Sequence, residues 1–389
     1  MNRAFKFTAL FFLLIQFSFS QLSDLDTRCI WIVRDSMNNE TMINSALVYA
    51  YQTGYNIVFV QVRGRGYAYY NSEIVPKNPK VSSDFDPLEY AVTLGHALGI
   101  EVHAWVNSYI LWSSESPPSD PTHLYHTHKD WPEANMHGKT DSQIRLSELQ
   151  SRQWEGIYLA PTHPEVNPYL LSVYSEIIDK YKIDGIHLDY IRFQDEMYGY
   201  NKSGMAIFDS TYNINPRDLV RGIISTRFGW SQEFVDSMYV AWDQFRRDAV
   251  TDLVRSVFQK MQKPVKIIAL SAAVKPNLVD ARYRWYQEWD KWIQDSIIDF
   301  VVPMNYFPEI RDFNNSVQIM KSNLTPDNLN IVIIGVSTHN QDAQSAADKI
   351  LLARVNGFHG VSIFSWNSHK NDLDWFLPIN EALGLRTFE

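Results

Sequence analysis

Eight short apolar stretches recur along the chain, separated by helical or long intervening segments, and this alternation limits the possible folds more than any other property of the sequence. The stretches are Cys29–Arg34, Asn56–Arg63, Glu101–Asn107, Ile186–Ile191, Val265–Ala272, Asp299–Tyr306, Asn330–Val336 and Gly360–Trp366. Alternating strands and helices imply a parallel sheet with right-handed crossovers, and eight strands favour closure into a barrel. An open doubly wound sheet is the alternative, but no glycine-rich phosphate turn follows the first strand. The sequence therefore predicts an α/β fold, a (β/α)8 TIM barrel.

Amphipathic segments between these stretches supply the helices. They lie near Met42–Tyr51, Leu88–Leu98, Leu170–Tyr181, Phe245–Met261 and Ala343–Val355. The first two end close to a glycine that precedes a strand, as helix C-terminal capping predicts. Two long stretches, Leu111–Pro168 and Gln194–Asp243, follow the third and fourth strands. In a barrel these loops lie on the face that carries the active site.

The N-terminus resembles a secretory signal. Arg3 and Lys6 precede the apolar run Phe7–Phe19, and a small-residue cleavage site ends before Gln21. An N-terminal membrane anchor is the alternative, but the run is shorter than the roughly 20 residues that a spanning helix needs. We therefore expect residues 1–20 to be removed and residues 21–389 to form a single, secreted or periplasmic barrel domain without stable membrane insertion.

The charge of the chain also limits its partners. Thirty-five Lys and Arg residues against 44 Asp and Glu residues give a formal net charge of −9. A negatively charged chain is repelled by a nucleic-acid backbone, so we expect no nucleic-acid partner. The single cysteine, Cys29, allows no intrachain disulfide and is interpreted as a buried small residue.

Polar side chains alternate with aliphatic ones in three strands, which places them on the lumen side of a barrel. They are Gln61 and Arg63 in the second strand, His103, Trp105 and Asn107 in the third, and His187 and Asp189 in the fourth. Burying such groups without partners costs about 1–3 kcal/mol each. They must therefore satisfy one another or contact a ligand.

Asp189 ends the fourth strand, where barrel enzymes place catalytic groups. Its carboxylate is interpreted as a nucleophile, a base or a stabiliser of a developing cation; the alternative is a buried ion pair with Arg63 or Arg192. His103 and His187 either bind substrate or are lumen histidines whose hydrogen bonds are made within the protein.

The chain also holds 21 Phe, 12 Trp and 21 Tyr residues, many of them after strands. Flat rings beside amides suit sugar faces and hydroxyls.

Several motifs, taken in order, resemble the glycosyl-hydrolase-10-like family of exported bacterial barrel proteins. The resemblance runs from about Arg28 to Asn367. It rests on Arg28–Trp31, Gln61–Arg63 with Tyr70 and Ser72, Val102–Asn107, Tyr158–Pro161, His163–Val166, Asp184–Asp189, Trp289 with Trp292, Ile298–Pro303 and Ile363–Trp366. The family often has a second acid after the fourth-strand Asp, where this chain has Tyr190, and tends to have Gln where this chain has Asn305.

The resemblance implies a glycoside hydrolase acting on a cell-envelope polysaccharide, such as the glycan strands of peptidoglycan. Most glycosidases use two carboxyl groups, and Glu288 is the expected partner of Asp189, with Glu73, Asp195 and Glu196 in reserve. A substrate acetamido group in place of the second carboxylate is an alternative. The expected substrate-binding residues are Gln61, Arg63, Tyr70, His103, Trp105, Asn107, His187, Asn305, Tyr306 and Trp366.

Two other functions remain open at this point. A carbohydrate-binding barrel without catalytic activity would fit the missing second acid after Asp189. Metal-dependent hydrolysis through His103, His187 and Asp189 lacks a paired-histidine motif. We therefore expect neither a metal nor a cofactor, and an oligosaccharide or polysaccharide as the partner.

Overall fold

The structure, a computed structural model, describes residues 25–144, 154–262 and 268–384. The predicted secretory signal and the first residues of the predicted strand Val265–Ala272 lie outside these ranges.

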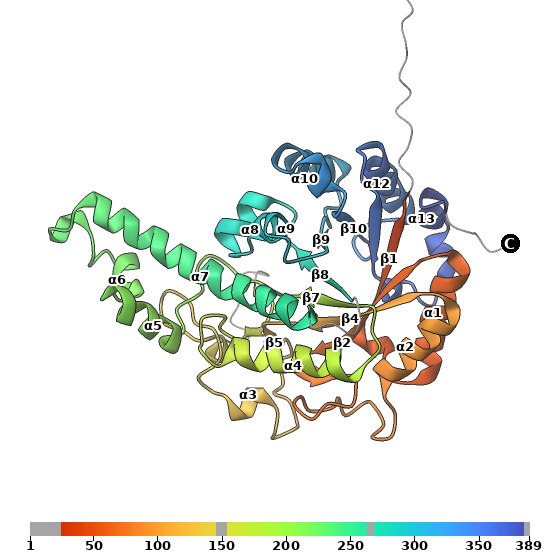
Figure 1. The fold of residues 1–389 in the computed structure, drawn as a ribbon, viewed down its shortest axis with the longest axis horizontal. Helices are drawn as coiled ribbons and strands as arrows, with labels where there is room; N and C mark the ends of the chain where they lie inside the picture. The colour runs from red at the N-terminus through yellow and green to blue at the C-terminus, as the bar shows by residue number, and fades with distance from the viewer. Residues whose placement is uncertain (1–24, 145–153, 263–267, 385–389) are drawn as a thin grey trace, which may run out of the picture.

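Eight parallel strands form the centre of the molecule, as predicted (Figure 1). They are β1 (Thr27–Ile32), β2 (Ile57–Gly64), β4 (Glu101–Asn107), β7 (Gly185–Asp189), β8 (Ala269–Val274), β9 (Phe300–Pro303), β10 (Ile333–Ser337) and β11 (Gly360–Phe364). Hydrogen-bonded neighbours follow the order β10-β11-β1-β2-β4-β7-β8-β9. Parallel bridges from Val301 to Val332 and from Met304 to Gly335 join the two ends of this series. The sheet is therefore a nearly closed barrel, and the open-sheet alternative is excluded.

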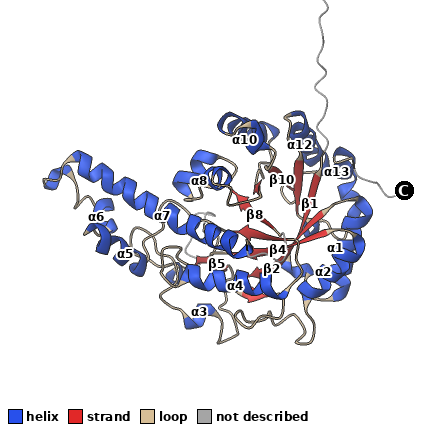
Figure 2. Cartoon of the chain, in the orientation of Figure 1, coloured by secondary structure: helices blue, strands red, loops and turns tan. Residues whose placement is uncertain are grey.

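Helices surround the strands (Figure 2). They are α1 (Glu40–Thr53), α2 (Pro87–Leu98), α3 (Leu124–Thr127), α4 (Val166–Lys180), α5 (Lys202–Tyr212), α6 (Pro216–Val220), α7 (Gln232–Met261), α8 (Leu278–Arg284), α9 (Trp289–Gln294), α10 (Ile310–Asn323), α11 (Pro326–Leu329), α12 (Ala343–Val355) and α13 (Leu377–Ala382). Three short strands lie outside the barrel series: β3 (Tyr67–Ala68), paired with β2, and the pair β5 (Ile110–Trp112) and β6 (Ile157–Tyr158). In the part of the chain that the structure describes, no helix combines the length and the apolar content needed to cross a bilayer.

Local sequence signals fix the ends of the first two helices. Asn39 caps α1 by accepting a hydrogen bond from the backbone N–H of Met42, and Asp86 caps α2 ahead of a proline. Both helices end at a glycine in the left-handed region, Gly54 with φ 96° and Gly99 with φ 74°. These are the stops that the sequence indicates, and each is followed directly by a strand.

The two faces of the strands carry different side chains. Outward-facing aliphatic residues pack against the helices in a large core, among them Ile30, Ile32, Val58, Val60, Val102, Val106, Ile186 and Leu188. The lumen is filled by a smaller cluster that includes Cys29, Trp31, Phe59 and Trp105. The ring of His187 lies against Trp31 and Phe59, with centroids 4.5 and 4.2 Å apart. The barrel interior is therefore a packed plug of rings and not a channel.

An arm projects from the barrel between β7 and the second half of α7 (Figure 1). It consists of α5, α6 and the first half of α7, so the predicted helix Phe245–Met261 extends further toward its N-terminus, to Gln232. The arm has its own apolar cluster, formed by Tyr200, Phe208, Ile214, Leu219, Ile224, Val235 and Trp242. This cluster lets the arm hold its shape away from the barrel core.

Gly185 is required where the lumen is most crowded. A methyl group at Gly185 would lie 2.3 Å from Nδ1 of His103, a fully buried ring that also packs against Phe59 and Phe300. We expect Gly185→Ala to lower the free energy of unfolding by about 3 kcal/mol, because the ring has no space to move into. The control is Gly357→Ala, where φ is +85° and nothing lies within 4 Å. This control should lose only about 1 kcal/mol to backbone strain. Urea unfolding measures both, and equal losses would contradict the crowding.

Candidate active site

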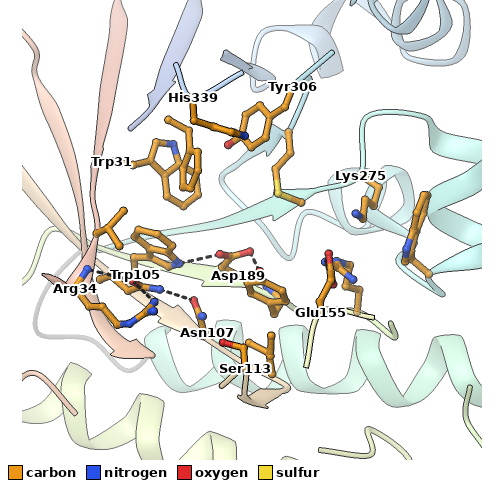
Figure 3. Close-up of a pocket in the computed structure, with 18 of the residues that line it drawn as sticks. Trp31, Arg34, Trp105, Asn107, Ser113, Glu155, Asp189, Lys275, Tyr306 and His339 are labelled. Carbon is orange, nitrogen blue, oxygen red and sulfur yellow. Dashed lines mark hydrogen bonds and ion pairs between the residues drawn. The ribbon is translucent and has the colours of Figure 1, made fainter. Parts of the chain in front are cut away.

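One pocket lies over the carboxyl ends of the barrel strands and has a volume of about 650 Å³ (Figure 3). Each of the eight strands contributes a lining residue within its length or shortly after its end. The lining consists of Trp31, Val33, Arg34, Gln61, Arg65, Trp105, Asn107, Ile110, Ser113, Glu155, Asp189, Tyr190, Arg192, Lys275, Pro276, Trp285, Met304, Tyr306, Phe307, His339 and Phe364. This is the face on which barrel enzymes carry out their chemistry.

Asp189 faces this pocket from the end of β7. One carboxylate oxygen accepts a hydrogen bond from the indole N–H of Trp105 at 3.0 Å, and the other accepts one from the backbone N–H of Tyr190 at 2.7 Å. Burial raises the pKa of Asp189 to about 6, although these two donors and the Arg192 charge act in the opposite direction. Asp189 is therefore a carboxyl group that can hold its proton in mildly acidic solution.

Glu155 is a second carboxyl group of the same pocket, and it has the opposite electrostatic setting. Its oxygens accept hydrogen bonds from Arg192 at 3.1 and 2.8 Å, and the Tyr158 hydroxyl also donates to one of them. Although burial works in the other direction, the Arg192 charge holds the pKa of Glu155 below its usual range. Glu155 therefore stays ionised where Asp189 is still protonated.

Lys275 is a third ionisable group, placed just after β8. Burial, reinforced by the nearby Arg192 charge, lowers the pKa of Lys275 to about 7. Its ammonium group lies 4.5 Å from the centroid of the Trp285 ring, a distance at which a cation and a π face attract each other. Asp189, Glu155 and Lys275 (Figure 3) thus form one electrostatically linked group with Arg192.

Aromatic rings and amides make up most of the remaining wall. Tyr306 stacks on Phe364 with centroids 5.3 Å apart, and Trp31 meets Trp105 edge-on at 4.7 Å. The amide nitrogen of Gln61 donates to Asn107 Oδ1 at 3.0 Å. Flat apolar faces beside fixed amide groups offer the two kinds of contact that a sugar ring presents, its C–H faces and its hydroxyls.

The structure brings only part of the predicted site together. Asp189, Gln61, Trp105, Asn107 and Tyr306 line the pocket. His103 and His187 lie beneath it, fully buried in the lumen plug, and burial lowers the pKa of His187 well below its ordinary value. His187 Nδ1 is 2.8 Å from the Ser271 hydroxyl, so it has a partner in the protein. These two histidines lie beneath the pocket and do not line it.

Arg63 does not face the lumen, contrary to the strand alternation that we expected. The register shifts between β2 and β4 so that Gln61 pairs with Trp105 but Arg63 pairs with Val106. This bulge turns Arg63 outward, where it donates to the backbone carbonyls of Asn107 and Ser108. Arg63 therefore stabilises the end of β4 from the outer face of the barrel and does not contact Asp189 in the pocket.

Glu288 is also not part of the pocket lining. Its side chain is only 2% exposed and lies within 4 Å of the cationic groups of Arg247, Arg282 and Lys291. It precedes the short helix α9, and the cations come from α7, α8 and α9. These cations hold Glu288 in the helical shell. The expectation that Glu288 is the partner of Asp189 in the pocket is therefore wrong.

The other predicted residues lie outside the pocket wall as well. Tyr70 is buried against Tyr181, Trp366 is buried at 4% exposure, and Asn305 donates to the Phe313 carbonyl of α10. The reserve acids Glu73, Asp195 and Glu196 are paired with Lys180 or Arg284. Among the described residues, no three His, Cys, Asp or Glu side chains gather as a metal site.

The sequence-based prediction missed Glu155, Lys275 and Trp285. One usable signal was present for Glu155, since it comes just before the Tyr158–Pro161 motif that had already been singled out. Asp141 fixes this segment by accepting a hydrogen bond from the backbone N–H of Tyr158 at 3.0 Å. No sequence pattern reveals this contact, so the sequence alone does not place the segment at the mouth of the barrel.

Carboxyl groups set among rings at the mouth of a (β/α)8 barrel define the class of the barrel glycoside hydrolases. A family model described as "Glycosyl hydrolase-like 10" matches residues 25–349, and the chain belongs to this family. The resemblance found in the sequence motifs is thereby confirmed, and the matched range includes Glu155, Asp189 and Lys275.

Two relatives are named glycosyl hydrolases, and a solved structure shares the fold. Glycosyl hydrolase DigH of Escherichia coli K12 is 22% identical over 298 residues, which cover 71% of this chain and 60% of DigH. Glycosyl hydrolase YngK of Bacillus subtilis is 24% identical over 278 residues, covering 65% of this chain and 46% of YngK. The chain thus spans three fifths or less of each of these relatives. The PgaB (BpsB) glycoside hydrolase domain of Bordetella bronchiseptica shares the fold, with a TM-score of 0.65 and 13% identity over 93% of this chain and 99% of that one.

The pKa of Asp189 depends on the Trp105 hydrogen bond, which stabilises the charged form. We expect Trp105→Phe to raise this pKa by about one unit above its value of about 6, the effect of losing one hydrogen bond to a charged group. Carbon-13 NMR of side-chain carboxyls, with the Asp189 signal assigned through Asp189→Asn, measures it. Trp292→Phe is the control, because its indole N–H donates to Thr251 and not to the pocket. A wild-type Asp189 that titrates near 4 would contradict the raised pKa of this carboxyl group.

Proposed function

We propose that the chain is an exported glycoside hydrolase that cleaves a cell-envelope polysaccharide, with the glycan strands of peptidoglycan as the first candidate. One observation carries the proposal: two carboxyl groups, Asp189 and Glu155, share a ring-lined pocket, and their pKa values are displaced in opposite directions. Such a division is how one site holds both a proton donor and a negative charge. The family membership and the secretory signal predicted for residues 1–20 support the class of substrate and the export.

Asp189 takes the role of general acid in this proposal. Cleavage of the glycosidic bond requires a proton on the departing oxygen, and a carboxyl group with a pKa near 6 can deliver it. Trp105 and the Tyr190 backbone fix both oxygens of the carboxyl group. The donor therefore keeps its orientation during the reaction.

Glu155 supplies the negative charge. As the bond between the anomeric carbon and the departing oxygen breaks, positive charge develops on the sugar ring, and an ionised carboxylate stabilises it. Water then adds its hydroxide to the anomeric carbon, and its proton restores Asp189. Arg192 keeps Glu155 ionised. The Arg192 guanidinium and the Tyr158 hydroxyl together hold the Glu155 carboxylate in place.

Gln61, Asn107 and the pocket rings position the sugar. Gln61 and Asn107 hydrogen-bond each other and both line the cavity, so their remaining amide N–H groups keep fixed directions. Trp285, Tyr306 and Phe364 add ring faces to the same pocket lining. The bound sugar is thereby oriented before the carboxyl groups act on it.

Substitution of the two carboxyl groups tests this assignment. We expect Asp189→Asn and Glu155→Gln each to lower kcat by about 10²–10⁴-fold on glycan strands freed of peptides, because each removes one half of the acid–base chemistry. Release of reducing ends measures the rate. Glu196→Gln is the matched control, since Glu196 is half exposed, pairs with Arg284 and lies outside the pocket lining.

The same experiment separates hydrolysis from binding alone. A wild-type chain that binds the strands but releases no reducing ends from them or from other envelope glycans would make it a carbohydrate-binding barrel. Full activity in Asp189→Asn would remove the proton donor from the proposal. Loss of activity in Glu196→Gln would indicate a general folding defect, which circular dichroism of each variant detects.

The pH profile gives an independent check. As the pH rises through about 6, Asp189 releases its proton, so kcat/KM should fall tenfold per unit on the basic side. The acidic side should lie below the ordinary pKa of a glutamate, because Arg192 keeps Glu155 ionised. In Lys275→Met the nearby cation is lost, and the basic limb should move to higher pH. A basic limb that does not move, or that lies above pH 8, would contradict Asp189 as the acid.

A further inference from the structure

A smaller pocket adjoins the candidate active site and shares two of its arginines. It has a volume of about 170 Å³ and is lined by Arg34, Asp35, Arg65, Tyr67, Tyr69, Asn78, Pro79, Lys80 and Trp112. Arg34 and Arg65 line both pockets, so they stand on the boundary between them. A polymer that extends from the larger pocket into the smaller one passes these two guanidinium groups.

Neutral partners fix both arginines. Arg34 donates from its guanidinium to Gln61 Oε1 at 3.1 Å, and its backbone N–H donates to the same oxygen. Arg65 donates from Nε to the Ser113 hydroxyl at 2.9 Å. In the described ranges of the chain, neither arginine has a carboxylate within ion-pair distance. Their positions are therefore set without neutralising their charge.

The boundary is positively charged in a chain that is negative overall. Three cations, Arg34, Arg65 and Lys80, line the smaller pocket against one carboxylate, Asp35, whereas the whole chain has a net charge of −9. After burial, the charge of Arg34 is the next cause that lowers the pKa of Arg65, while Asp35 acts in the opposite direction. Two like charges held side by side repel each other, and an anion placed between them relieves that repulsion.

The geometry of the guanidinium group limits the kind of anion. Its planar fork of N–H donors matches two oxygens of a carboxylate or a sulfate group. Tyr67, Tyr69 and Trp112 line the same small pocket and provide ring faces next to the cations. Rings beside a charged fork suit a sugar unit that carries an acidic substituent.

We propose that the boundary formed by Arg34 and Arg65 is a subsite for an acidic group on the glycan, a carboxylate or a sulfate ester, so that the substrate is an anionic polysaccharide. The inference rests on the proposed function, because it takes the larger pocket to hold the sugar unit whose bond is cleaved. The acidic group then belongs to a neighbouring sugar unit, and the two arginines set both the affinity and the register of the chain in the cleft.

Binding to matched acidic and neutral glycans tests the subsite. The probes are oligogalacturonate, hyaluronan, peptide-free peptidoglycan strands, their carboxyl-reduced counterparts, and chondroitin sulfate with its desulfated form. We expect the wild-type chain to bind at least one acidic probe, with Kd about ten- to a hundredfold weaker for the matched neutral form. Loss on carboxyl reduction identifies a carboxylate, and loss on desulfation identifies a sulfate.

Substitutions of the arginines complete the test. Arg65→Gln and Arg34→Gln should weaken binding of the acidic probe by the same factor, weaken binding of the neutral probe much less, and reduce the dependence of Kd on salt. Arg311→Gln is the matched control, because that side chain is 83% exposed on α10. Equal affinity for acidic and neutral probes, unchanged binding in both arginine variants, or no binding of any acidic probe would overturn the subsite.

Hydrolysis of the same probes keeps this inference separate from the proposed function. Equal cleavage of acidic and neutral forms would overturn the subsite and leave the hydrolase intact. Arginine-dependent binding of an acidic probe without any cleavage would support the subsite while removing the hydrolase assignment.

Discussion

The packing of aromatic rings inside a nearly closed barrel is the constraint on which the other features depend. Trp31, Phe59, Trp105 and His187 fill the lumen, so the strands cannot collapse and their carboxyl ends stay apart. The indole N–H of Trp105 is at once part of this plug and a hydrogen-bond donor to Asp189. The same side chain therefore contributes to the stability of the core and to the acidity of the pocket.

Burial and charge act on the two pocket carboxyl groups in different proportions. Asp189 is surrounded mainly by neutral donors and apolar rings, so desolvation prevails and its pKa rises. Glu155 lies against Arg192, and this ion pair outweighs the cost of its own burial. A single cation thus gives two chemically similar groups different charge states in mildly acidic solution, with Glu155 ionised where Asp189 still holds its proton.

The barrel and the position of Asp189 could be predicted from the sequence because both follow from local patterns. Aliphatic residues alternate along β4 and β7, and Asp189 is the last residue of its strand. Glu155 could not be placed in this way, since it lies in the long connection between β4 and α4 and reaches the pocket through contacts with Arg192 and Tyr158. The position of Glu288 depends on three cations from neighbouring helices, which no periodicity reveals.

The bulge in β2 has a consequence for how the cleft is inherited and changed. Because successive side chains of a strand alternate between its faces, one additional residue exchanges the face of every residue that follows it. Here the additional residue sends Arg63 into the outer layer, while Arg65 lines the cleft in the turn beyond. Loss of this one residue would turn Arg63 toward the pocket while the other seven strands kept their register. The set of charged groups that line this pocket can therefore change through the removal of one residue from β2, without substitutions in the other strands.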